Sequence, residues 1–329
     1  MQIKDLIKDT EWRPGGNSSD CHPEVSVLLP VEAGDHNNLL HKSVNSILSQ
    51  TLKNLELIVI DDGSKTPLDL SIFNDAPKNI DCVLLINKIP KGGNFARNRG
   101  IKMASSEYIA FLDDDDEFFI EKIERIQQAI LTYPETDIFY HLAKIQMVNE
   151  GLFYYSKLKE FNNEDVFKNL LIGNFIGGTP MTVIKKKSLM DVDCFDEKMP
   201  ALQDYDLWLR MAKKKMKFKF LDLALTKYNY VTKKKTVSKS FTANKKAKGL
   251  IKSKFIADYN KLSKYELSKH DAYMRNNFVH RAILNNQIKR ALKIQYKQLL
   301  CNINFTNLLK LFAILLGPKF IFKMKSKGF

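Results

Sequence analysis

The sequence predicts an α/β fold in which a mainly parallel central sheet is flanked by helices. Short apolar segments rich in Val, Ile and Leu alternate with segments of helical periodicity through the first 132 residues. Turn or acidic residues follow three of the apolar segments, as they do where a parallel sheet carries a binding site on one edge. The last third of the chain is strongly basic and has helical periodicity, which indicates a helical extension beyond the sheet.

The individual elements follow from this alternation. Strands are expected at residues 25–29, 55–60, 83–86 and 108–112, and helices at residues 39–49, 94–104 and 120–132. Pro30 is expected to end the first strand because proline donates no backbone hydrogen bond. Since the carboxyl ends of parallel strands meet at one edge, Pro30, Asp61–Asp62 and Asp113–Asp116 are predicted to form one site.

The later part of the chain is less regular. The pattern loses its periodicity beyond Phe139, a short helix is expected at Asp204–Ala212, and a helical region at residues 245–300. These boundaries predict an N-terminal extension at 1–23, an α/β domain at 24–225 and a basic, mainly helical region at 226–329.

Charge is divided unevenly along the chain. The whole sequence carries a net charge of +15, and residues 211–329 contain 29 Lys and Arg against 4 Asp and Glu. Such a basic region favours an anionic partner, either nucleic acid or anionic lipid. Its lysine clusters lack the interleaved aromatic residues of base-stacking surfaces, which makes nucleic acid the weaker candidate.

The cysteines and the apolar segments indicate a cytoplasmic protein. Cys21, Cys82, Cys194 and Cys301 form no CxxC pair, so neither a zinc site nor a disulfide framework is predicted. Residues 1–20 lack the apolar core of a signal peptide, and no segment reaches the roughly 18 apolar residues that span a bilayer.

The acidic run Asp113–Asp116 directly follows an apolar strand segment. Carboxylates this close together repel one another, and a hard cation such as Mg²⁺ or Mn²⁺ would relieve that repulsion. The alternative is a solvated acidic turn that caps a helix beginning near Phe118.

The order and spacing of six segments between residues 24 and 222 are similar to those of the family 2 glycosyltransferases. The segments are Ser26–Pro30, Ser46–Thr51, Leu57–Ser64, Gly92–Gly100, Phe111–Asp116 and Gln203–Arg210. The resemblance implies the GT-A fold and an inverting hexosyltransferase, of the type that builds bacterial polysaccharide or lipooligosaccharide. It also implies a nucleotide diphosphate sugar donor, a glycan or lipid-linked acceptor, and a divalent cation.

The resemblance also implies roles for residues on the donor side. Asp62 would accept a hydrogen bond from a uracil-type base, which favours a UDP donor, and Arg97 would meet a phosphate or a base edge. From the residues alone, an Asp-Gly turn is the favoured role of Asp62, and a position on a helix surface suits Arg97 equally well. Asp115 would bind the metal, while Asp113 and Asp114 would hold the ribose or share the cation.

On the acceptor side, Asp204 matches the family's catalytic base, and its alternative role is a helix N-cap. Trp208 is assigned to the core. Pro30 and Glu32 are placed beside the nucleotide. Glu32 and Ala33 stand where the family usually has an aromatic residue and Asn, which leaves the identity of the base open.

The Gln-x-x-Arg-Trp signature of processive members is missing, so a single sugar transfer is expected. Two other functions stay open at this point. A nucleotidyltransferase could share the acidic metal site but would not need the Asp204–Trp208 element, and a nucleic-acid-binding protein would explain the basic region.

Residues 305–329 are predicted to lie on an anionic membrane surface, on the inner face of the cytoplasmic membrane. Apolar residues recur there at helical spacing among Lys310, Lys319, Lys323, Lys325 and Lys327. The alternative is a helix whose apolar stripe packs against the catalytic domain.

Overall fold

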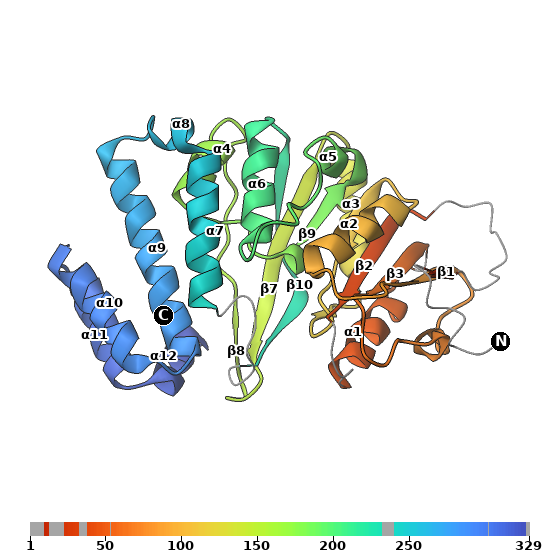
Figure 1. Ribbon diagram of the computed structural model, residues 1–329, viewed down its shortest axis with the longest axis horizontal. Coiled ribbons are helices and arrows are strands. Elements are labelled where there is room, and N and C mark those ends of the chain that lie inside the picture. Colours follow the sequence, from red (N-terminus) through yellow and green to blue (C-terminus); the bar gives the residue numbers. More distant parts are fainter. Residues whose placement is uncertain are drawn as a thin grey trace.

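The α/β fold is confirmed by the computed structural model, which describes residues 10–12, 23–32, 38–52, 54–231, 240–301 and 303–326. Within these residues a mixed ten-stranded sheet has the order β1-β4-β3-β2-β5-β9-β7-β10-β6, and β8 pairs with β7. Helices cover the sheet on both faces, and a group of C-terminal helices stands at one end of the molecule (Figure 1).

The N-terminal half of the sheet is parallel. Its strands are β2 (Val25–Val31), β3 (Leu55–Asp61), β4 (Ile80–Ile86) and β5 (Tyr108–Phe111). β2, β3 and β5 are buried throughout, which accounts for their continuous apolar sequences. The expectation that Pro30 ends β2 is wrong, because the strand continues to Val31. Pairing with β5 stops at Leu28, so Pro30 has a strand neighbour on one side only and its missing N–H is tolerated.

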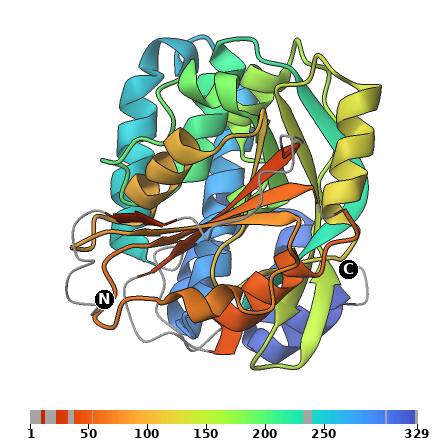
Figure 2. The ribbon, with the colours of Figure 1, turned by 90° about the vertical axis from the view of Figure 1, so that its right-hand side faces the viewer.

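The alternation of side chains along β2 places helices on both faces of this half. Its helices are α1 (Asn38–Leu48), α2 (Gly93–Met103) and α3 (Lys122–Thr132). α1 and α3 pack with Val27, and α2 packs with Leu28 on the other face. Seen from the β1 end, α2 and α3 lie on opposite sides of the strands (Figure 2). At Gly100 a Cβ would lie 3.0 Å from Ile60 Cδ1, so glycine permits the close approach of α2.

The second half of the sheet is mostly antiparallel and lies where the sequence pattern was irregular. Its strands are β6 (Glu117–Phe118), β7 (Ile138–Met147), β8 (Leu152–Tyr155), β9 (Thr182–Lys185) and β10 (Phe218–Tyr230). β10 is parallel to β7 and antiparallel to β6. The alternative that Asp113–Asp116 cap a helix is wrong, since β6 follows them and α3 begins only at Lys122.

Short elements complete this part of the chain. They are β1 (Thr10–Trp12), which is antiparallel to β4, η2 (Leu70–Phe73), α4 (Val166–Ile172), η3 (Thr179–Met181), α5 (Lys186–Met190) and α6 (Gln203–Lys213). The helix expected at Asp204–Ala212 is thus confirmed as α6.

The predicted helical character of the C-terminal region is also confirmed. Its helices are α7 (Phe241–Lys254), α8 (Ile256–Tyr259), α9 (Lys264–Leu284), α10 (Ile288–Cys301), α11 (Phe305–Leu315) and α12 (Pro318–Ser326). α7 and α8 contribute Ile251 and Tyr259 to the core around α6. α9 to α12 form a separate apolar cluster that includes Ile314 and Phe322.

The division at residue 225 stays a prediction, and β10 runs through it to Tyr230. Across the described part of the chain, no helix is both long and apolar enough to cross a membrane.

Candidate active site

A cavity of about 520 Å³ lies at the carboxyl ends of the parallel strands. Of the residues that the sequence analysis placed in the site, those that line the cavity are Pro30, Glu32, Asp62, Arg97, Asp113, Asp114, Asp115 and Asp204. Asp61 and Asp116, which were predicted at the same edge, are buried and do not line it. The strand ends form one wall, and η3 with the start of α6 forms another part of the lining. The topology thus brings together residues that are up to 174 positions apart in the sequence.

Asp62 is buried and organises the loop that leads into α2. Its carboxylate accepts hydrogen bonds from Asn87 Nδ2 at 2.8 Å, from the Lys91 backbone N–H at 3.0 Å and from the Gly92 N–H at 2.6 Å. Gly63 adopts a positive φ of 77°, so the Asp-Gly turn is also present. A carboxylate has about four acceptor positions, so this one keeps capacity for a hydrogen bond from a ligand in the cavity.

Arg97 projects from α2 toward the acidic run. Its Nη2 donates to Asp113 Oδ1 at 2.7 Å, and its guanidinium carbon lies 5.7 Å from the centre of the Phe195 ring. The ion pair and the ring hold the guanidinium at the cavity wall. Arg97 is therefore more than a helix-surface residue.

The four aspartates of the acidic run have two different environments. Asp113, Asp114 and Asp115 line the cavity, and Asp114 accepts the Glu32 N–H at 3.2 Å. Asp116 is buried, and its Oδ1 accepts the Asn229 N–H at 2.8 Å. Burial, followed by the charges of Asp115 and Asp113, holds the pKa of Asp116 well above its ordinary value.

Lys122, which the sequence analysis did not single out, lies fully buried between the acidic run and η3. Its Nζ donates to the Pro180 carbonyl at 2.8 Å and to Thr226 Oγ1 at 3.1 Å. Burial lowers the pKa of Lys122 well below its ordinary value, and the charge of Asp116 opposes that effect. Since Pro180 lines the cavity, the hydrogen bond from Lys122 holds part of the cavity lining in place.

Asp204 lies in the first turn of α6, and the position before the helix is taken by Leu202 in a left-handed conformation with φ of 55°. The N-cap alternative for Asp204 is therefore wrong in its position, although Asp204 Oδ1 accepts the Tyr205 N–H at 2.7 Å. Burial raises the pKa of Asp204 to about 6; the Tyr205 N–H and the charge of Arg97 counteract the rise. A carboxylate with this pKa is ionised at neutral pH and can accept a proton.

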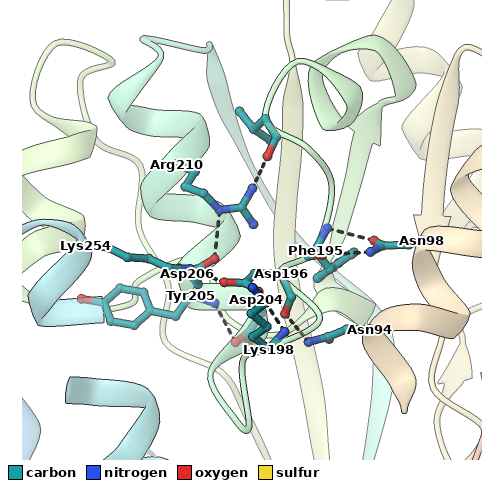
Figure 3. Close-up of polar contacts among 11 residues, drawn as sticks. Asn94, Asn98, Phe195, Asp196, Lys198, Asp204, Tyr205, Asp206, Arg210 and Lys254 are labelled. Atoms are coloured by element: carbon teal, nitrogen blue, oxygen red, sulfur yellow. Dashed lines mark hydrogen bonds and ion pairs between the residues drawn. The ribbon is translucent and has the colours of Figure 1, made fainter. Parts of the chain in front are cut away.

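Hydrogen bonds on both sides hold the segment that leads into α6 (Figure 3). Asn98 of α2 exchanges two hydrogen bonds with the backbone of Phe195, at 2.8 and 2.9 Å. Two residues after Asp204, the fully buried Asp206 binds Arg210 Nε at 2.9 Å and Lys254 Nζ at 2.7 Å. These contacts position the first turn of α6 from outside the cavity.

Trp208 is fully buried and donates from Nε1 to the Gly177 carbonyl at 3.1 Å. Its placement in the core is confirmed.

Three cavity residues come from the segment after residue 225 and were missed by the sequence analysis. Tyr228 lies on β10, Asn244 on α7 and Arg281 on α9. The sequence signal for Arg281 is weak: it is one of three arginines among 29 basic residues in 211–329. The basic region therefore contributes three residues to the lining of the cavity.

The residues present suit a divalent cation. Mg²⁺ and Mn²⁺ bind through one or two carboxylates completed by substrate phosphates, and the cavity offers Asp113, Asp114 and Asp115 side by side. Among the described residues, no group of three or more His, Cys, Asp or Glu side chains could by itself hold a metal ion. The site would consequently depend on the substrate to complete the coordination.

Comparisons with known proteins find relatives that are named glycosyltransferases. A glycosyltransferase from Haemophilus influenzae, named as uncharacterised, is 29% identical over 226 residues, which cover 68% of this chain and 75% of the relative. The amylovoran biosynthesis glycosyltransferase AmsB of Erwinia amylovora is 26% identical over 217 residues, 64% of this chain and 71% of AmsB.

Among solved structures, TarS 1–349 of S. aureus in complex with UDP-GlcNAc matches with a TM-score of 0.56 and 16% identity, over 89% of this chain and 79% of that one. At this identity the match shows the shared fold. The model of glycosyl transferase family 2 matches residues 26–193, which contain the strand ends, the acidic run and α2. Because this family model covers just over half of the chain, the protein belongs to glycosyl transferase family 2 and is a glycosyltransferase.

Proposed function

We propose that the protein transfers one sugar from a nucleotide diphosphate sugar, with UDP as the favoured nucleotide, to a hydroxyl of a glycan or lipid-linked acceptor with inversion. The observation that carries this proposal is the position of Asp204 in the same cavity as Asp62 and Asp113–Asp115. A base on one wall and nucleotide-binding groups on the other provide the two halves of a direct displacement.

Asp204 is the general base of this reaction. It takes the proton of the acceptor hydroxyl while that oxygen attacks the anomeric carbon from the face opposite the leaving diphosphate. Its pKa of about 6 leaves it mostly ionised at neutral pH yet more basic than an exposed aspartate. Arg97, held by Asp113 at 2.7 Å, borders the side where the diphosphate binds.

A divalent cation, Mg²⁺ or Mn²⁺, would be held by Asp115 and Asp113. When bound it neutralises negative charge on the diphosphate. Asp114, tied to the Glu32 N–H, faces the same space and would hold the ribose.

Two relatives support the substrate class. AmsB is named for amylovoran biosynthesis, and the TarS structure holds UDP-GlcNAc. We infer a role in the synthesis of a cell-surface polysaccharide or lipopolysaccharide, with one sugar added per turnover. Nucleic acid is not expected as a partner.

Slow hydrolysis of donors tests this function without knowledge of the acceptor. The purified protein is incubated with UDP, GDP and CMP sugars in Mg²⁺ or Mn²⁺, and the released nucleotide is measured. Metal-dependent release from one donor class, at least tenfold above that of Asp204→Asn, supports the proposal. Equal release by both proteins from every donor would contradict it.

We also propose that the protein binds the anionic inner face of the cytoplasmic membrane through the α11 patch, defined as Phe305, Leu308, Leu309, Phe312, Leu315 and Leu316. These side chains are 46% to 73% exposed, while Ile314 on the other side of the helix is buried. An apolar helix face open to solvent beside a basic region favours attachment within the lipid interface. Lys327 lies outside the described residues.

Co-sedimentation with vesicles of anionic lipid, compared with vesicles of neutral lipid, tests this placement. The change is Leu308→Ser with Phe312→Ser, and the matched control is Ile120→Ser with Leu131→Ser, two exposed apolar residues elsewhere. The first variant is expected to lose at least tenfold in binding to anionic vesicles, because each removed side chain contributes about 1.5–3 kcal/mol when buried in lipid. Equal binding by both variants would place the contact elsewhere.

A further inference from the structure

The wall of the cavity that the C-terminal region supplies differs from the strand-end wall. The C-terminal wall, defined as Tyr228, Asn244 and Arg281, carries a guanidinium, an amide and a phenol. The strand-end wall carries the carboxylates of Asp62 and Asp113–Asp115. The cavity is therefore acidic where the chain's parallel strands end and basic where α9 enters it.

Asp204 lies within the electrostatic influence of both arginines of the cavity. The charges of Arg97 and Arg281 both lower the pKa of Asp204 against the effect of burial. Arg97 is engaged by Asp113 at 2.7 Å on the strand-end side. Arg281 projects from α9. Burial lowers the pKa of its guanidinium, and Tyr273 and Tyr230 counteract that effect.

A guanidinium binds anions of a particular shape. It presents five N–H donors in a planar fork that matches the oxygens of a phosphate or a carboxylate. Such a charge-assisted contact is about twice as strong as a neutral hydrogen bond. The surplus of 29 basic over 4 acidic residues in 211–329 adds a long-range attraction for an anion approaching this side.

We propose that Arg281 binds a phosphate or carboxylate group of the acceptor, which places a neighbouring hydroxyl at Asp204. This inference rests on the proposed function and specifies its acceptor as an anionic one. In the transfer, the hydroxyl proton passes to Asp204 and the acceptor oxygen bonds to the anomeric carbon. The bond from that carbon to the diphosphate breaks, and the nucleoside diphosphate leaves with the electron pair.

The test compares anionic and neutral probes on the full-length protein by calorimetry. Inorganic phosphate, glucose 6-phosphate and glucose are each titrated into the protein alone and into the protein saturated with UDP and Mg²⁺. We expect both anions to bind the UDP-saturated protein at least tenfold more tightly than glucose does. Arg281→Gln should weaken anion binding at least tenfold and leave UDP binding within twofold of wild type.

Two further variants guard against loss of structure. Arg281→Lys keeps the charge but not the fork, so it should retain intermediate anion affinity and remains informative if Arg281→Gln does not fold. Arg290→Gln is the matched control, because Arg290 is an exposed arginine on the next helix that stacks on Phe241. It should bind the anions within twofold of wild type.

The outcomes distinguish an anionic group of the acceptor from the diphosphate of the donor as the ligand of Arg281. Weaker UDP binding in Arg281→Gln with unchanged anion binding would assign Arg281 to the donor diphosphate and overturn the inference. Phosphate binding that is no tighter than glucose binding in the wild type would also overturn it. Absence of UDP binding in the wild type would count against the proposed function, while the titrations without UDP would still decide whether Arg281 binds an anion.

Discussion

The two walls of the cavity are built in different ways. The strand-end wall comes from residues 30 to 115, in which each group follows a parallel strand or begins α2. The other wall consists of residues from η3, the start of α6, β10, α7 and α9, and it includes the C-terminal wall. These residues are spread over positions 179 to 281.

This difference determines which groups of the cavity depend on the parallel sheet. The acidic groups for the donor are fixed by the topology of the parallel sheet, and a shift of one residue in any strand would displace them. The facing wall depends on helices that pack late in the chain, such as α9, so its residues can vary without altering the sheet. Under the proposed function, donor binding and acceptor choice would therefore reside on different elements.

The largest expected effect is on catalysis, from Asp204→Asn. The amide keeps the size and the hydrogen bond from the Tyr205 N–H but lacks a base, so transfer should fall about 10²–10⁴-fold. Initial rates with the donor found by the hydrolysis screen measure this loss. UDP affinity should stay within twofold, and a rate within tenfold of wild type would assign the base to another residue.

The next largest effect is on stability, and it distinguishes Asp206 from Asp204 on the same helix, α6. Asp206 is fully buried and binds both Arg210 and Lys254, so Asp206→Ala leaves two cations without their carboxylate. Loss of one partner of a buried ion pair typically costs about 3–5 kcal/mol of unfolding free energy. Urea unfolding is the measurement, and Asp204→Asn is the control that should lose no stability. A loss below about 1 kcal/mol would show that the network does not hold α6.

A smaller effect concerns two adjacent, chemically identical residues of the acidic run. Asp115 belongs to the strand-end wall, and Asp116 is buried behind it. Asp115→Ala should reduce Mg²⁺-dependent UDP binding about 10- to 100-fold, because a carboxylate at the cation position is lost. Asp116→Ala should chiefly reduce stability, by about 1–3 kcal/mol, since the Asn229 N–H loses its acceptor. Calorimetry with and without Mg²⁺ measures the first effect. Equal metal-dependent affinity in Asp115→Ala and wild type would remove Asp115 from the metal site.

Much of the strand-end wall could be predicted from the sequence because buried parallel strands have continuous apolar sequences. Pro30 lies near the end of such a run, Asp62 and Asp113 follow one, and their common edge follows from the alternation of strands and helices. The same reasoning could not divide the acidic run, because burial of Asp116 depends on its contact with Asn229, which is 113 residues away.

The other half of the fold offered weaker signals. β10 has register shifts near Leu221 and Ala224 against β7, which interrupt the two-residue alternation expected of a strand. Lys122 resembles any lysine at the start of a helix until Pro180 and Thr226 surround it. Arg281 reaches the cavity only because α9 packs beside the sheet, and no local pattern encodes that packing.

The smallest expected effect is a pH dependence that links the two roles of Asp204, as a base and as a buried group. Because its pKa is raised from 3.8 to about 6, the transfer rate should decline below about pH 6, by roughly tenfold per pH unit, as the base becomes protonated. The native state also holds this proton more tightly than the unfolded chain does. The group therefore contributes stability that is fully present below pH 3.8 and is lost as the pH rises through about 6. Asp204→Asn has no such titration, so its thermal midpoint relative to wild type should rise between pH 4 and pH 7. A constant difference across that range, together with a transfer rate that is flat from pH 5 to pH 7, would show that the carboxylate is not held in a desolvated wall.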